Sequence, residues 1–173
     1  MTANKTNAMR ALEAHKIPYQ VFTFSPDIHS ATGVAEALGL PPEHVYKTLV
    51  VLRPQGRPML IMIAGPRELD LKLVSQAVGE KKVHMAAHKE AEGLTGLQVG
   101  GISALALLNR PFDVFIDRPA TQLSHVLVSA GKRGINLRLA VADLIRITRA
   151  RVIEATAGAG DIYLPGSSEL PGR

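Results

Sequence analysis

The chain has 173 residues, 46% hydrophobic and 20% charged, a composition typical of one globular domain with its own core. It contains no cysteine, which excludes disulfide bonds and a protein thiol nucleophile, and its 4% of aromatic residues argue against a base-stacking platform. The formal net charge of +5 suits a polyanionic partner whose phosphates would provide most of the affinity.

The chain ends and the apolar runs indicate a cytoplasmic protein without a membrane partner. No apolar run reaches the length of a membrane-spanning helix, and residues 1–5 lack the apolar core of a signal peptide. We expect a single domain over residues 1–157. Residues 158–173, rich in Gly, Ser and Pro, are expected to form a flexible C-terminal tail.

The N-terminal part of the chain is predicted to contain short helices around one strand. Apolar residues at helical spacing predict a helix over residues 6–15, and the aromatic and β-branched residues 19–24 predict a strand. Thr32 is expected to cap a second helix that stops at Gly39. Pro42 is expected to open one more helical turn.

The central part is predicted to begin with a β-hairpin. Residues 45–52 form a short run rich in β-branched residues, which predicts a buried strand, and residues 59–64 predict its partner. Asp70 is a suitable N-cap for a helix closed by Gly79. Shorter elements are expected as a strand over 83–86, a helix over 88–92 ended by Gly93 and Gly96, and a strand from Leu97 into the turn at Gly100 and Gly101.

The C-terminal part is predicted to contain three strands and a helix. Residues 112–117 have an alternating pattern, are bounded by prolines, and predict a strand. Residues 125–129 and 135–139 have the pattern of a β-hairpin. Residues 141–148 fit an amphipathic helix. Hairpins and short helices without a regular strand–helix alternation predict an α+β fold rather than a doubly wound parallel sheet.

Lys47 is the charged residue within the strand predicted over 45–52. An ammonium there must reach water along its own stem, pair with an anion, or lose its proton. This stretch alone favours the first of these, a lysine at the end of a strand with its charge in solvent.

Two pairs of residues that include histidine offer weak signals for chemistry. His84 and His88 have the spacing of helical metal ligands, but the glutamate of the zinc protease motif is missing, which disfavours a metal site. Ser124 and His125 are neighbours in a predicted strand and are expected to face opposite sides, so we do not expect them to form a hydrogen-bonded pair.

Two glycine-containing turns could bind an anionic group. Residues 100–103 could offer backbone N–H groups to an oxyanion or a carboxylate, because glycine permits a close approach. Residues 129–134 combine a tight turn with Lys132 and Arg133, which suits a phosphate or a carboxylate. For each turn taken singly, an ordinary turn with solvated charges is the simpler interpretation.

Three segments together are far more specific than any one of them. In order and spacing, Tyr46-Lys47-Thr48-Leu49, Val99-Gly100-Gly101-Ile102-Ser103 and Val128-Ser129-Ala130-Gly131-Lys132-Arg133-Gly134-Ile135 resemble the YbaK/EbsC family. These are free-standing aminoacyl-tRNA deacylases related to the editing domain of bacterial prolyl-tRNA synthetase, and the best-known branch hydrolyses Cys-tRNA(Pro). The resemblance spans roughly residues 6–153. It implies a mixed, curled, barrel-like β-sheet with flanking helices and no metal or organic cofactor.

The resemblance also implies roles for individual residues. Lys47 matches the family's essential lysine and is expected to be catalytic. The residues expected to bind the aminoacyl substrate are Phe24, Thr48, Gly100, Gly101, Ile102, Ser103, Ser129 and Gly131. Contacts to tRNA are expected from Lys81, Lys82, Lys132 and Arg133. The implied partner is mischarged tRNA(Pro), with prolyl-tRNA synthetase as a candidate second partner.

Two positions depart from the family pattern. Ala104 stands where the pocket loop usually ends in proline, and Phe24 replaces a tyrosine, so the departures concern amino-acid specificity. From the resemblance we expect a trans-editing deacylase that acts on Cys-tRNA(Pro). Either the substrate thiol or water is expected to attack the ester carbonyl. The alternatives are a deacylase for Ala, Ser or Thr on tRNA, and a non-catalytic module that binds tRNA or a synthetase.

Overall fold

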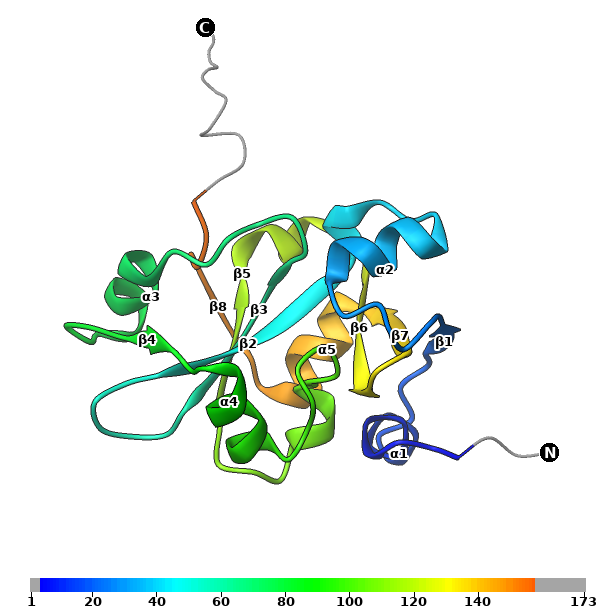
Figure 1. The fold of residues 1–173 in the computed structure, drawn as a ribbon, viewed down its shortest axis with the longest axis horizontal. Coiled ribbons are helices and arrows are strands. Elements are labelled where there is room, and N and C mark those ends of the chain that lie inside the picture. The colour runs from blue at the N-terminus through cyan, green and yellow to red at the C-terminus, as the bar shows by residue number, and fades with distance from the viewer. Residues whose placement is uncertain (1–3, 158–173) are drawn as a thin grey trace, which may run out of the picture.

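The computed structural model describes residues 4–157, which contain five α-helices and eight strands (Figure 1). The helices are α1 (Asn7–Ala14), α2 (Ala31–Leu38), α3 (Leu71–Val78), α4 (His88–Thr95) and α5 (Val141–Thr148). The strands are β1 (Gln20–Thr23), β2 (Tyr46–Leu52), β3 (Met59–Ala64), β4 (His84–Met85), β5 (Asp113–Asp117), β6 (His125–Lys132), β7 (Ile135–Ala140) and β8 (Arg151–Ile153). The tail predicted over 158–173 lies outside the described residues.

The strands form two sheets that meet at one point. The smaller sheet is antiparallel, with the order β1-β7-β6, and the larger one is mixed, with the order β4-β2-β3-β5-β8. Val45, just before β2, forms a parallel bridge to Leu127 of β6 and so joins the two sheets. The predicted α+β fold with a mixed sheet and flanking helices is confirmed, but the strands do not close into a barrel.

The hydrophobic core has three parts, one between the sheets and one on the outer face of each. All six residues of β3 are buried, as expected for a central strand covered on both faces. Its even-numbered residues join α1, α5, β6 and β7 in the main cluster, and its odd-numbered residues pack beneath α3. The outer face of the smaller sheet packs against α2. Within residues 4–157, no helix is both long and apolar enough to cross a membrane.

Several local predictions are confirmed residue by residue. The Asp70 carboxylate accepts hydrogen bonds from the first-turn N–H groups of Lys72 and Leu73, and Gly79 ends α3 in the left-handed conformation. β3 and α5 have the predicted bounds, and a short 3₁₀ turn occupies Pro42–His44. These elements have strong signals within a few residues of sequence.

Four predictions were wrong. Ser30, not Thr32, caps α2, because its hydroxyl accepts from the Gly33 N–H at 3.0 Å. α4 continues through Gly93 to Thr95. Residues 97–103 form a loop rather than a strand. Ser124 and His125 do form a hydrogen bond, at 3.0 Å, because Ser124 precedes β6 and the alternation of strand side chains does not apply to it.

Candidate active site

Lys47 is held in place by a backbone carbonyl. It is the second residue of β2, it is half-buried, and its Nζ donates to the Gly65 carbonyl at 2.9 Å. Gly65 has no room for a side chain, since a Cβ there would lie 2.9 Å from the Ala31 Cβ and 3.2 Å from the Val45 carbonyl oxygen. An ammonium has three N–H donors, so two remain for a ligand. Lys47 is therefore a fixed donor rather than a lysine whose charge simply extends into solvent.

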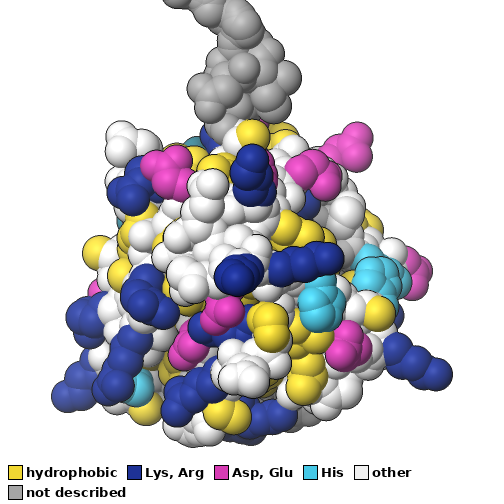
Figure 2. Space-filling view, turned by 90° about the vertical axis from the view of Figure 1, so that its left-hand side faces the viewer, with side chains coloured by type: hydrophobic (Ala, Val, Ile, Leu, Met, Phe, Trp, Pro, Cys, Tyr) yellow, Lys and Arg dark blue, Asp and Glu magenta, His cyan; other side chains and the backbone are white. Residues whose placement is uncertain are grey.

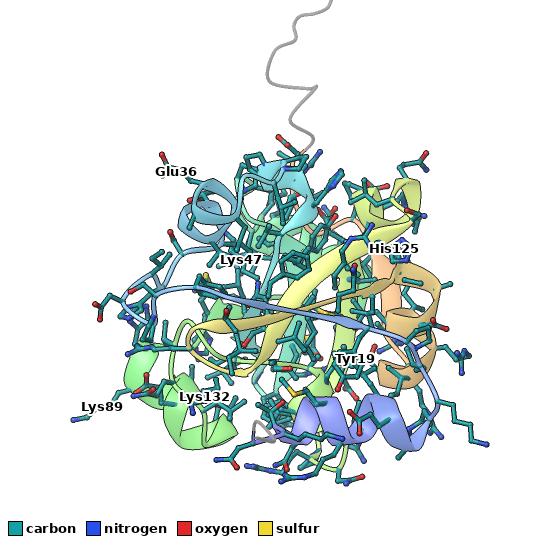
Figure 3. The ribbon with its side chains drawn as sticks, turned by 90° about the vertical axis from the view of Figure 1, so that its right-hand side faces the viewer. Tyr19, Glu36, Lys47, Lys89, His125 and Lys132 are labelled. Carbon is teal, nitrogen blue, oxygen red and sulfur yellow. The ribbon has the colours of Figure 1, made fainter. Side chains whose placement is uncertain are left out.

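The Lys47 side chain lies in a cavity with a volume of about 440 Å³. Figure 3 shows Lys47 between α2, marked by Glu36, and the start of α4, marked by Lys89. The cavity lies between the start of α2, the edge of β2, β4, α4, the loop at 99–102 and the β6–β7 pair. Its lining includes His29, Lys47, Thr48, Glu68, Met85, His88, Gly100, Ile102, Ser129 and Asn136. A cavity of this size holds a small organic group such as an amino acid with part of a nucleoside.

One wall of the cavity is a stretch of β2 with no neighbouring strand. Val45, just before β2, is bridged to β6, and β2 is paired with β4 from Val51 onward. Among the described residues, 46–50 face no strand on this side. The larger sheet therefore has a gap along β2, and the cavity occupies it.

The register of β2 and β3 shows which backbone groups face this gap. The Gly65 N–H donates to the opposite Val45 carbonyl at 2.8 Å, so the odd-numbered residues of β2 direct their backbone groups to β3. The even-numbered residues then face the other way, and the Val50 carbonyl accordingly accepts from the Ala86 N–H at 3.0 Å. The N–H and C=O of Thr48 point into the cavity and are available to a ligand.

The two glycine-containing turns lie directly against each other, although 30 residues separate them. The Arg133 Nε donates to the Val99 carbonyl at 2.7 Å, and the Glu92 carboxylate accepts from the Val99 N–H at 2.8 Å. A Cβ on Gly101 would lie 3.0 Å from the Arg133 backbone nitrogen and 3.1 Å from the Lys132 carbonyl carbon. A side chain at position 101 would push these two backbone segments apart, and their close approach sets the position of Gly100 and Ile102 in the cavity wall.

Comparison of the sequence with known protein families identifies the domain that contains this cavity. The sequence profile described as the aminoacyl-tRNA editing domain matches residues 25–147, which is most of the chain and includes all three motifs. The chain belongs to the aminoacyl-tRNA editing domain family. Deacylation, the hydrolysis of the ester between an amino acid and tRNA, is the activity of this family.

Individual relatives agree with this assignment. A protein of Enterococcus faecalis named "Putative Cys-tRNA(Pro)/Cys-tRNA(Cys) deacylase EbsC" is 40% identical over 157 residues, which are 90% of this chain and 95% of that one. The proline–tRNA ligase of Nitratidesulfovibrio vulgaris is 28% identical over 133 residues, 77% of this chain and 22% of the ligase. A crystal structure described as "a putative trans-editing enzyme for prolyl tRNA synthetase" has a TM-score of 0.76 and 24% identity, covering 90% of this chain and all of that one. The last of these supports the fold.

Five of the nine residues assigned to catalysis and substrate binding line the cavity of this editing domain: Lys47, Thr48, Gly100, Ile102 and Ser129. The other four, Phe24, Gly101, Ser103 and Gly131, lie behind its walls. The buried Ser103 hydroxyl accepts from the Ala106 N–H at 3.2 Å, and a Cβ on Gly131 would lie 3.0 Å from the Ala106 Cβ. Phe24 packs in the cluster beneath α2. The structure thus gives these four a supporting position, and direct substrate contact by them stays a prediction.

Asn136 is a cavity residue that the sequence analysis missed. It lies opposite Ser129 in the β6–β7 pair, is only 6% exposed, and lines the cavity. Within residues 4–157 its side-chain amide has no hydrogen-bond partner. The amide is therefore available to hydrogen-bond with a ligand in the cavity. The hairpin predicted from the sequence could have revealed Asn136, because its register pairs this residue with Ser129.

Other charged and polar cavity groups come from two loops, at His29 and Glu68, and from the start of α4, at His88. His29, Glu68 and His88 line the cavity and were not predicted as site residues.

Burial, reinforced by the nearby Asp117 charge, raises the pKa of Tyr46 to about 12, so this phenol stays protonated at neutral pH. Residues 4–157 contain no group of three or more His, Cys, Asp or Glu side chains that could hold a metal ion.

The four predicted tRNA-binding cations differ in their surroundings. Lys81 and Lys82 are exposed between α3 and β4. Figure 2 views the molecule from the side of α3 and β4, and many Lys and Arg side chains lie on that face. Lys132 is exposed at the end of β6 and lies on the same side of Figure 3 as Lys89. Arg133 is half-buried because its Nε holds the loop at Val99, so its role is at least partly structural.

Proposed function

We propose that this protein is a cytoplasmic trans-editing enzyme that removes cysteine from Cys-tRNA(Pro). The observation that carries the proposal is the fixed Lys47 ammonium in a cavity built from all three motifs. The relative named for Cys-tRNA(Pro) and Cys-tRNA(Cys), which matches nearly end to end, supports this choice of substrate. Prolyl-tRNA synthetase is the proposed second partner.

The chemistry needs little from the protein beyond positioning and charge. The aminoacyl ester is already activated, and its carbonyl oxygen gains negative charge when the carbon is attacked. The free N–H donors of Lys47 can stabilise this charge or orient the aminoacyl group, and the Thr48 backbone groups can align it. The chain has no cysteine, so a thiol nucleophile would have to come from the substrate, and water is the alternative. In both cases the bond to the terminal ribose oxygen breaks, and that oxygen takes up the proton that the nucleophile gives up. Attack by water releases the free amino acid, whereas attack by the substrate thiol forms a cyclic thioester that water then opens.

A deacylation panel tests the proposal. Proline tRNA charged with Cys, Ala, Ser or Thr is incubated with the protein, and the remaining ester is measured over time. Fast hydrolysis of Cys-tRNA(Pro) alone supports the proposal. Preferential hydrolysis of another ester would assign the protein to a different branch of the family, and no hydrolysis of any ester would favour a binding module.

Binding of tRNA is expected to weaken steeply with salt. If several phosphates contact Lys81, Lys82 and Lys132, affinity should fall about tenfold or more between low and physiological ionic strength. Fluorescence anisotropy with labelled tRNA measures this, and the double variant Lys81→Ala/Lys82→Ala should flatten the salt dependence. Lys5→Ala is the matched control, because Lys5 is paired with Glu13 at 2.6 Å on α1. A flat salt dependence of the wild type would argue for a small-molecule substrate.

Ala104→Pro is expected to sharpen the preference for cysteine. The φ of Ala104 is −63°, which proline adopts without strain, and Ala104 is buried directly after Ser103. Proline should restrict the loop and narrow the cavity behind Ile102. A side chain that differs by one methylene changes the binding free energy in a pocket by only ~1–3 kcal/mol. A slightly wider cavity should therefore make the wild type discriminate against Ser and Ala less well than Ala104→Pro does. The ratio of kcat/KM for Cys- to Ser- and Ala-tRNA(Pro) checks this, and an unchanged ratio would contradict it.

A further inference from the structure

The turn that holds Lys47 is itself held by the last described segment of the chain. Gly65 lies in a tight turn closed by a hydrogen bond from the Arg67 N–H to the Ala64 carbonyl at 3.0 Å. Directly after it, Leu69 forms an antiparallel bridge with Thr156, and the Asp70 N–H donates to the Ala155 carbonyl at 2.8 Å. Residues 64–70 are therefore attached to residues 155–156, although about 90 positions separate them in the sequence.

A chain of side-chain hydrogen bonds runs through this attachment. The Arg67 guanidinium donates to the Thr156 hydroxyl at 2.9 Å and to the Ala157 carbonyl at 3.3 Å. The Thr156 hydroxyl donates its own proton to the Asp117 carboxylate, whose second oxygen accepts from the Ala155 N–H at 2.8 Å. A hydroxyl has one proton and two lone pairs, so Thr156 can receive from Arg67 and donate to Asp117 at the same time.

Asp117 is an unusual residue to find at this place. It is the last residue of β5 and only 1% exposed, and it does not line the cavity. A buried carboxylate is costly unless hydrogen bonds and a nearby positive charge compensate it. Here the Thr156 hydroxyl donates to one carboxylate oxygen and the Ala155 N–H to the other. Arg67 supplies the positive charge through its hydrogen bond to Thr156. Two apolar residues would hold β5 and the C-terminal segment together without the desolvation cost of a buried charge. The carboxylate differs from them because its hydrogen bonds fix the orientation of the groups that donate to it.

We propose that Asp117 is a positioning residue for Lys47. Through Thr156 and Arg67 it fixes the 64–70 turn, and the turn fixes the Gly65 carbonyl that orients the Lys47 ammonium. Gly65 keeps its own hydrogen bond to the Val45 carbonyl, so loss of a side-chain connection should turn the Gly65 carbonyl, and with it the ammonium, by a small amount against the bound ester. The proposal rests on the role of Lys47 in the proposed function. A small misplacement of a reacting group is enough to lower a rate strongly.

The sharpest test uses a matched pair at position 156. Thr156→Val keeps the shape of the side chain but removes the hydroxyl, whereas Thr156→Ser keeps the hydroxyl. We expect Thr156→Val to lower kcat for deacylation about tenfold with an unchanged KM, and Thr156→Ser to keep most of the wild-type kcat. Asp117→Asn should resemble Thr156→Val. Glu154→Gln is the control, because it removes a carboxylate of the same segment that pairs with Arg118 at the surface.

A readout on Lys47 separates positioning from simple loss of stability. The NMR signal of the Lys47 side chain, assigned with Lys47→Arg, should shift in Thr156→Val and Asp117→Asn and stay in place in Glu154→Gln. Thermal unfolding shows at which temperature each variant is folded, and the rates are compared there. A folded Thr156→Val protein with the wild-type kcat and an unshifted Lys47 signal would overturn the proposal. The NMR readout needs no substrate, so it remains decisive even if the wild type does not deacylate Cys-tRNA(Pro).

Discussion

Lys47→Ala is expected to lower kcat/KM for deacylation by about a hundredfold or more, the usual cost of removing a donor to a developing negative charge. The fold should be little affected, because the lost hydrogen bond to Gly65 is at the half-buried edge of the core. Affinity for tRNA should also change little if the exposed lysines provide the phosphate contacts, as we propose. Single-turnover hydrolysis, anisotropy with tRNA and thermal unfolding measure the three quantities.

Lys47→Arg is the informative companion variant. Its charge is the same, but a planar guanidinium cannot take the place of a compact ammonium beside the Gly65 carbonyl. We expect it to be nearly as inactive as Lys47→Ala. Lys5→Ala, on the exposed surface beside α1, should hydrolyse the ester at the wild-type rate. If Lys47→Ala turns over as fast as the wild type, Lys47 has no part in the reaction.

Gly101→Ala is expected to produce the largest combined loss of stability and activity. The added methyl group would approach the Arg133 nitrogen and the Lys132 carbonyl carbon, both backbone atoms that cannot rotate away. Overpacking of this kind costs about 1–3 kcal/mol in the free energy of unfolding. The loop at 99–102 must move away from the β6–β7 turn, so the cavity wall is displaced and kcat/KM should fall about tenfold or more.

Gly93→Ala provides the control for that substitution. Gly93 lies inside α4, and nothing is within 4 Å of the position that its Cβ would take. Alanine is favoured over glycine in a helix, so this variant should be more stable than the wild type by about 0.5–1 kcal/mol and equally active. Urea unfolding and deacylation of both variants give the comparison. Equal stability of Gly101→Ala and Gly93→Ala would show that the two turns do not restrain each other.

The sequence predicted best those elements whose signals are local. Asp70 and Gly79 mark both ends of α3, and the apolar run at 59–64 is β3 over its full length. β8 was missed because three residues that pair in parallel with β5 leave no pattern of their own. Residues 97–99 have strand-like composition, yet side chains of Glu92 and Arg133 hold Val99 instead of a neighbouring strand. Such contacts between distant residues are not visible in a short window of sequence.

The candidate site was predicted in part for the same reason. The three motifs, through a family resemblance, pointed to Lys47 and to the two turns that the structure places around one cavity. The resemblance did not reveal Asn136, which lies opposite Ser129 in the β6–β7 pair and lines the same cavity. It also did not reveal that Gly101 and Gly131 support the walls from behind. Whether a residue touches the ligand or supports one that does is decided by tertiary packing.

The gap along β2 has a consequence for how amino-acid preference can evolve in this fold. The wall at Thr48 presents main-chain N–H and C=O groups, which every residue except proline carries. Side-chain mutations on β2 therefore leave that wall's hydrogen-bonding pattern intact, and it can serve any aminoacyl ester. A new preference has to arise on the other walls, at Asn136, at Met85 or in the loop before Ala104. In the proposed mode of binding, one wall is thus common to all substrates, and the other walls are free to diverge.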